Sequence, residues 1–115
     1  MMDVERVVAQ RLMGATGINA VLEVPEDRPS EFISVEMTGG TRERLCIQHA
    51  SLAVQSWAQT RQRAAEIARL VEQATPCLTE EPNIFRAVAN GTYRWPDPDS
   101  RQARYQTNVE LTICE

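Results

Sequence analysis

The chain has few residues that could carry out bond-making chemistry, and those few are scattered. It contains one histidine, His49, and three cysteines, at positions 46, 77 and 114. A serine, threonine or cysteine nucleophile needs an adjacent base, which is most often histidine. His49 lies in a stretch that has neither a predicted helix nor the sharp turn that presents a nucleophile. We therefore expect no catalytic residue, and we interpret His49 as a surface or packing residue.

Metal and cofactor sites are not indicated either. Cys46, Cys77 and Cys114 are odd in number and form no C-x-x-C pair, so neither a zinc site nor a redox motif is predicted. We expect three free, mostly structural thiols in a reducing compartment. Asp97 and Asp99 could face one cation, but no further oxygen ligands follow at EF-hand spacing. The sequence thus predicts no metal and no cofactor.

Composition restricts the class of protein. The chain has 115 residues, of which 43% are hydrophobic and 24% charged, which is typical of one globular domain spanning residues 1–115. The net charge of −4 argues against direct recognition of nucleic acid. All twelve basic side chains are arginines, whose guanidinium groups tolerate partial burial at interfaces. No apolar run reaches signal or membrane length, so we expect a soluble, cytoplasmic protein.

The first half of the chain predicts one helix and three strands. Asp3 is a plausible cap of a helix that ends at Gly14 or Gly17. Strands are expected at residues 20–24, 32–37 and 52–57. Between the last two, the pair Gly39-Gly40 is interpreted as a tight hairpin turn rather than a phosphate-binding loop, because no lysine and no helix follow it. Residues 41–49 show no regular pattern.

The second half predicts one helix and two strands. Thr60 can cap a helix that Pro76 prevents from running on. A strand is expected at residues 84–95, with a possible break at Asn90-Gly91, and a last strand from Tyr105 shows clean alternation of apolar and polar residues. The predicted buried residues are Leu52, Val54, Ile67, Val71, Val109 and Leu111. Short links between strands favour an α+β two-layer sandwich, with a mostly antiparallel or mixed sheet of four to five strands and two helices on one face.

The two predicted strands of the second half are joined by an unusual loop with the sequence WPDPDSRQAR, residues 95–104. Its two prolines lack N–H donors and stiffen the chain. A stiff loop loses little entropy when it docks onto a partner, and Trp95 beside it is a plausible aromatic anchor. On composition alone, however, a decorated surface turn is the better interpretation of the loop.

Three segments taken in order resemble a known family. Residues 24–40 read VPEDRPSEFISVEMTGG, residues 52–58 read LAVQSWA before a helix rich in alanine and arginine, and residues 93–109 read YRWPDPDSRQARYQTNV. In this order the chain resembles the small tail-terminator proteins (tail-completion or head-to-tail joining proteins) of long-tailed phages, in the version found in actinobacterial phages and prophages. The resemblance spans nearly the whole chain and rests on order and spacing, because no single motif is diagnostic.

The resemblance implies a structural protein rather than an enzyme. Such proteins have a two-layer α/β domain and assemble as a hexameric ring on the head-proximal end of the tail tube. There they stop the tube from growing and contact the head connector. The expected partners are thus further copies of the chain, the tail-tube protein and the connector, first in the host cytoplasm and later in the virion. A small acidic protein-binding module, regulatory or neutralising, is the alternative, and a small enzyme is a third, weaker one.

Ring formation requires surfaces that recognise one another, and two reversals carry charges of both signs. The first lies at residues 42–44 and the second at residues 97–104. We expect both to be exposed and to form the assembly surfaces. The candidate interface residues are Arg42, Glu43, Arg44, Trp95, Asp97, Asp99, Arg101 and Arg104.

Overall fold

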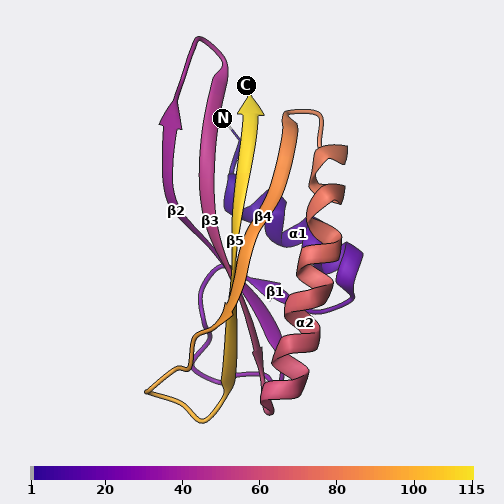
Figure 1. Cartoon of the computed structure of the whole chain (residues 1–115), viewed down its shortest axis with the longest axis vertical. Helices are drawn as coiled ribbons and strands as arrows, with labels where there is room; N and C mark the ends of the chain where they lie inside the picture. Colours follow the sequence, from indigo (N-terminus) through magenta and orange to yellow (C-terminus); the bar gives the residue numbers. More distant parts are fainter. Residues whose placement is uncertain (1) are drawn as a thin grey trace.

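The computed structural model describes residues 2–115 and consists of a five-stranded mixed sheet with two α-helices packed on one face (Figure 1). The elements in chain order are α1 (Val4–Thr16), β1 (Ala20–Val21), β2 (Phe32–Arg42), β3 (Ile47–Ala58), α2 (Arg61–Ala74), the 3-10 helix η1 (Thr75–Glu80), β4 (Ile84–Arg94) and β5 (Ala103–Cys114). The predicted α+β two-layer sandwich is therefore confirmed.

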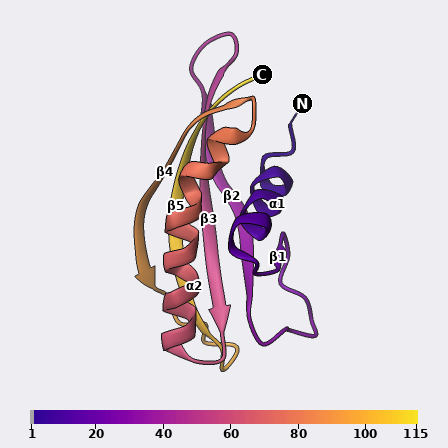
Figure 2. The ribbon, with the colours of Figure 1, turned by 90° about the vertical axis from the view of Figure 1, so that its right-hand side faces the viewer.

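The strands lie in the order β1-β2-β3-β5-β4, and only the short β1 pairs in parallel. The longest uninterrupted pairing joins β3 to β5, from Ile47 opposite Cys114 to Ala58 opposite Ala103. Because β5 also pairs with β4, the last strand of the chain lies inside the sheet. The long connection from β3 to β4 runs through α2, which covers the sheet (Figure 2).

Both helices begin where side chains can accept hydrogen bonds from free backbone N–H groups. Asp3 accepts from the N–H of Arg6, and Thr60 accepts from the N–H of Arg63. The first helix ends at Gly17, which has a φ of 76°, a left-handed conformation that glycine adopts without strain. The predicted caps are confirmed, and Gly17 rather than Gly14 ends α1.

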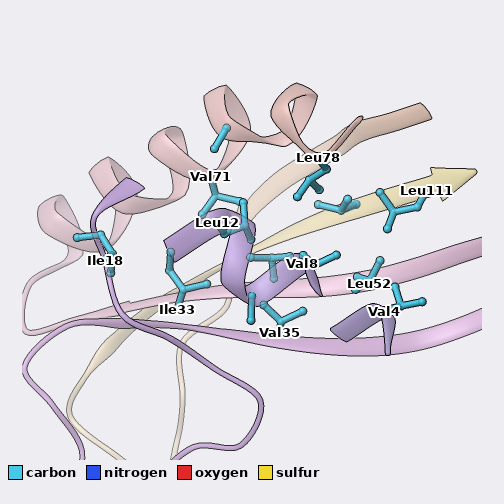
Figure 3. Close-up of a cluster of buried hydrophobic side chains, with 14 of the residues drawn as sticks. Val4, Val8, Leu12, Ile18, Ile33, Val35, Leu52, Val71, Leu78 and Leu111 are labelled. Carbon is cyan, nitrogen blue, oxygen red and sulfur yellow. The ribbon is translucent and has the colours of Figure 1, made fainter. Parts of the chain in front are cut away.

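One hydrophobic core fills the space between the sheet and the two helices (Figure 3). It is formed by alternate residues of the strands and by one stripe of each helix, as the periodicity of the sequence predicts. All six residues predicted to be buried have exposed fractions of 1% or less, namely Leu52, Val54, Ile67, Val71, Val109 and Leu111.

The prediction of a tight turn at Gly39-Gly40 is wrong. Both glycines lie within β2, opposite Ser51 and Ala50, next to a register shift that follows Met37. A Cβ atom on Gly40 would lie 3.2 Å from the carbonyl oxygen of His49, so glycine permits a close approach of two strands rather than a reversal. The chain reverses instead at residues 43–46, and the stretch predicted to be irregular contains the end of β2 and the start of β3. The strand predicted at residues 20–24 is reduced to two residues.

The prediction of three free thiols is also wrong. Cys46 and Cys114 form a disulfide with a Cα–Cα distance of 4.7 Å, and Cys77 alone is free. The two partners are 68 residues apart in sequence, but the β3–β5 register brings them together because Ile47 lies opposite Cys114. The cross-link therefore ties the β2–β3 hairpin to the end of the last strand.

The molecule is elongated, with principal extents of 45 × 24 × 24 Å. The β2–β3 hairpin projects at one end of the long axis, and the β4–β5 loop lies at the other (Figure 1). The beginning and end of the described chain lie together near the hairpin, where the backbone N–H of Met2 donates to Glu115 Oε2 over 2.6 Å. The two loops that were predicted to form assembly surfaces are thus at opposite ends of the fold.

We predict that Val109→Asp lowers the free energy of unfolding by about 3 kcal/mol or more, because it places an unpaired carboxylate in the apolar core. Asn108→Asp is the matched control. Asn108 and Gln106 share the face of the sheet opposite to Val109, and Asn108 already accepts a hydrogen bond there from Gln106. Urea unfolding measures both variants. Equal midpoints would show that the assignment of the two faces of β5 is wrong.

A second prediction concerns the disulfide. Opening a cross-link between residues 68 positions apart increases the entropy of the unfolded chain, so reduction should cost about 2–4 kcal/mol of stability. Cys77→Ser should leave stability unchanged. Titration of thiols in the denatured, unreduced protein should detect one per chain. Three thiols per chain would contradict the cross-link.

Candidate assembly surfaces

The first candidate surface is the hairpin tip, residues 42–46, which connects β2 to β3. Arg42 Nη1 donates to the carbonyl oxygen of Leu45 over 2.9 Å. The backbone N–H of Glu43 donates to the carbonyl oxygen of Ile47 over 2.8 Å. Together with the disulfide, these bonds fix the backbone of the tip. Its exposed charged side chains therefore project from a rigid support.

Sequence reasoning missed an interaction of His49 beside the hairpin tip. His49 Nε2 lies 2.6 Å from Glu43 Oε2, and His49 Nδ1 lies 3.4 Å from the hydroxyl of Thr112 on the neighbouring strand. A neutral ring would donate from Nε2 to the carboxylate and accept weakly at Nδ1. Carboxylate, imidazole and hydroxyl in a row also occur in hydrolases, but this row is solvent-exposed and its hydroxyl is distant. We interpret it as a brace that orients the tip.

The second candidate surface is the end loop, residues 95–102, between β4 and β5. Asp97 forms an ion pair with Arg28 at 3.1 Å, and the side-chain amide of Gln102 donates to the carbonyl oxygen of Pro29 over 2.8 Å. Arg28 and Pro29 belong to the connection between β1 and β2. The end loop is therefore tied down onto a second connection rather than extended into solvent.

Asp97 is the centre of this loop, and its side chain is 9% exposed. Burial alone would raise the pKa of the Asp97 carboxyl. Hydrogen bonds from the Ser100 hydroxyl, the Asp99 N–H and Arg28, together with the nearby charge of Arg104, outweigh burial and hold that pKa below its usual value. The ionised carboxylate thus stabilises the loop conformation.

An aromatic row crosses the uncovered face of the sheet next to the end loop. The ring centroids of Phe32 and Trp57 are 5.3 Å apart. The guanidinium of Arg104 lies 4.9 Å from the centre of Trp57 and 5.6 Å from that of Trp95, and Tyr93 stacks on Trp95 at 5.7 Å. Cation–π contacts of this kind hold an arginine in place. Trp57 is buried, whereas Trp95 and Tyr93 remain exposed, so the row ends in an aromatic platform.

A chain of side-chain hydrogen bonds continues from this row over the same face. The indole of Trp57 donates to Ser34, Ser34 donates to Gln55, and Gln55 donates to Gln106. Gln106 in turn donates to the hydroxyl of Tyr93 over 2.9 Å. The bonds link all four long strands. The uncovered face is therefore polar and rigid, in contrast to the apolar face beneath the helices.

The predicted interface residues divide into two groups by their surroundings. Asp97 and Arg104 have partners within the end loop and hold its shape, so they are less available to a partner than the sequence suggests. Asp99 and Arg101 are exposed at the same end. The charged residues of the hairpin tip are exposed at the other end. The structure therefore does not bring the residues of the hairpin tip together with those of the end loop.

Two kinds of feature are absent from the part of the chain that the structure describes. Within residues 2–115, no three His, Cys, Asp or Glu side chains gather closely enough to hold a metal ion. Over the same residues, no helix is both long and apolar enough to cross a membrane.

Comparison with known proteins does not assign the chain to a family. No protein-family model matches the chain, and no curated protein matches it.

We predict that the Asp97 carboxylate stabilises the protein at neutral pH but not in acid. A carboxyl with a lowered pKa in the folded state contributes stability above its unfolded pKa of about 3.9, and this contribution is lost as the pH falls through the lower folded value. Asp97→Asn should therefore be less stable than the parent by about 1 kcal/mol at pH 7. The difference should shrink below about pH 4. A difference that stays constant between pH 7 and pH 2.5 would contradict this role; thermal unfolding over that range measures it.

Proposed function

We propose that the protein is a phage or prophage tail terminator, which forms a ring on the head-proximal end of the tail tube and joins the tail to the head connector. The proposal rests on the resemblance of nearly the whole chain to that family. The observation that supports it most directly is the presence of two braced and chemically different ends on one elongated domain. One end is a charged hairpin tip, and the other is a loop beside an aromatic platform.

This arrangement suits a protein that caps a tube. A terminator must offer one surface to the tube and a different one to the connector, and ring closure requires a heterologous contact between neighbouring subunits. Each end is held by hydrogen bonds and ion pairs within the chain. Preorganised loops lose little conformational entropy on association. This property favours a protein that binds several partners one after another.

The chemistry of the partners follows from the two ends. The hairpin tip carries charges of both signs, which favour a correct register between subunits and disfavour wrong pairings. The aromatic platform of Tyr93 and Trp95, beside Arg104, has the residue types that dominate protein–protein binding energy. The mechanism is therefore capping by shape and charge complementarity.

We predict that Arg42→Glu combined with Arg44→Glu leaves folding intact and abolishes capping, so that tails grow to uncontrolled lengths. Each exposed charge pair contributes only about 1 kcal/mol or less, but a ring repeats the pair at every interface. Tail lengths measured by electron microscopy test the prediction.

Arg61→Glu combined with Arg69→Glu on the exposed side of α2 is the matched control, because it changes the net charge equally and lies away from the hairpin tip. Uniform tails with the hairpin variant, and long tails with the α2 variant, would move the assembly surface to the helix. Gene order separates the proposal from the alternative of an acidic binding module: a terminator gene should lie between the head-connector genes and the tail-tube gene.

A further inference from the structure

The hairpin tip presents a hydrophobic side chain to solvent. Leu45 is 98% exposed, more than any other large apolar residue described. It stands between Arg44 and the disulfide-bonded Cys46, in the reversal that connects β2 to β3. Exposed leucines are common on protein surfaces, but this one is held on a braced backbone by the bonds of the tip. A rigid, projecting apolar side chain has the form of an anchor that fills a pocket in a partner.

Charge surrounds this side chain. Among residues 2–115, no ion pair involves Arg42 or Arg44, while Glu43 is engaged by His49. The tip therefore presents one leucine flanked by two guanidinium groups that lack carboxylate partners. Its complement is a cleft that has an apolar wall and an acidic rim.

The same chain contains such a cleft beside β1 and the first half of β2. It has a volume of about 510 Å³, and its lining includes Leu22, Val24, Glu5, Glu23 and Glu36. Leu22 and Val24 are 37% and 36% exposed, so the apolar wall is accessible. Within the described residues, none of the three glutamates has a basic partner. The cleft is large enough to accept a leucine side chain.

Leu45 cannot reach the apolar wall of the cleft in its own chain, although Arg42 at the base of the tip lines the same hollow as Glu5. Arg42 and Glu36 are both on β2 and six residues apart, which is roughly 20 Å along a strand. Leu45 lies beyond Arg42, still farther from the cleft. Leu45 and the apolar wall of Leu22 and Val24 can therefore meet only between two molecules.

We propose that the hairpin tip of one copy docks into the acidic cleft of a second copy, with Leu45 against Leu22 and Val24 and with Arg42 and Arg44 facing the glutamates of the rim. Tip and cleft are different surfaces, so the contact is heterologous, and every added copy leaves one tip and one cleft free until the assembly closes. The inference rests on the proposed ring and names the contact that builds it.

The test is a charge exchange between the two surfaces. One variant combines Arg42→Glu with Arg44→Glu, and the other combines Glu23→Arg with Glu36→Arg. Each alone places like charges at every contact, so neither should self-associate, as measured by sedimentation and light scattering over a range of concentrations. An equimolar mixture should recover association, because the acidic tip fits the basic cleft and the basic tip fits the acidic one.

Two further variants test the anchor and its support. Leu45→Ala should weaken self-association by at least about tenfold, whereas Phe85→Ala, which removes another exposed apolar side chain on β4, should not change it. Opening the cross-link with Cys46→Ser and Cys114→Ser should also weaken association, and Cys77→Ser should not. Unfolding midpoints of all variants show whether any loss of association reflects unfolding.

The outcomes separate this contact from the proposed function. A parent protein that stays monomeric at all concentrations, charge variants that associate like the parent, or a mixture that recovers nothing would each overturn the tip-to-cleft contact. Rings and capped tails that survive all of these changes would leave the terminator role standing and show the contact to be wrong. If the mixture recovers self-association but the parent protein does not cap tubes, the result would support the contact and contradict the terminator role.

Discussion

The pairing of β3 with β5 is the constraint on which the rest of the structure depends. Its twelve-residue register runs without a break from Ile47 and Cys114 to Ala58 and Ala103. Because side chains alternate along both strands, this one register sends Val54, Val109 and similar residues beneath the helices and sends Gln55, Gln106 and their neighbours to the uncovered face. It also places Cys46 beside Cys114 at one end and brings the β4–β5 loop to the other end. A shift of one residue in either strand would turn the buried side chains of that strand to the uncovered face and separate the cysteines.

The two ends of this strand pair are rigid for different reasons. At the hairpin tip, a covalent cross-link and backbone hydrogen bonds fix a short reversal. At the end loop, a carboxylate with a lowered pKa, an ion pair to Arg28 and the guanidinium of Arg104 against Trp57 fix a longer one. The common result is that exposed functional groups sit on supports that contacts within the chain hold in place. This property is needed for assembly in a fixed register, where loose surfaces would permit wrong contacts.

The periodic parts of the chain could be predicted from the sequence, and the non-local parts could not. Alternation along Tyr105 to Ile113 and the stripe of α2 report burial directly, so the layers and the core followed from local patterns. The glycine pair at Gly39-Gly40 misled because glycine serves both tight turns and close strand contacts, and only the neighbouring strand distinguishes the two. The disulfide could not be found because its partners are far apart in sequence and become neighbours only through the register. The loops were identified as candidate surfaces, but the internal partners of Asp97 and Arg104, and the anchor-like exposure of Leu45, depend on tertiary contacts.

The central claim is that the protein caps one end of a tail tube, and the most direct measurement is its position on the tube. Electron microscopy of tail tubes from the same genome, incubated with gold-labelled protein, locates it. The account predicts label at one end only, with no further growth of the labelled tubes. Label distributed along the tubes, or tubes that remain unlabelled and continue to grow, would contradict it.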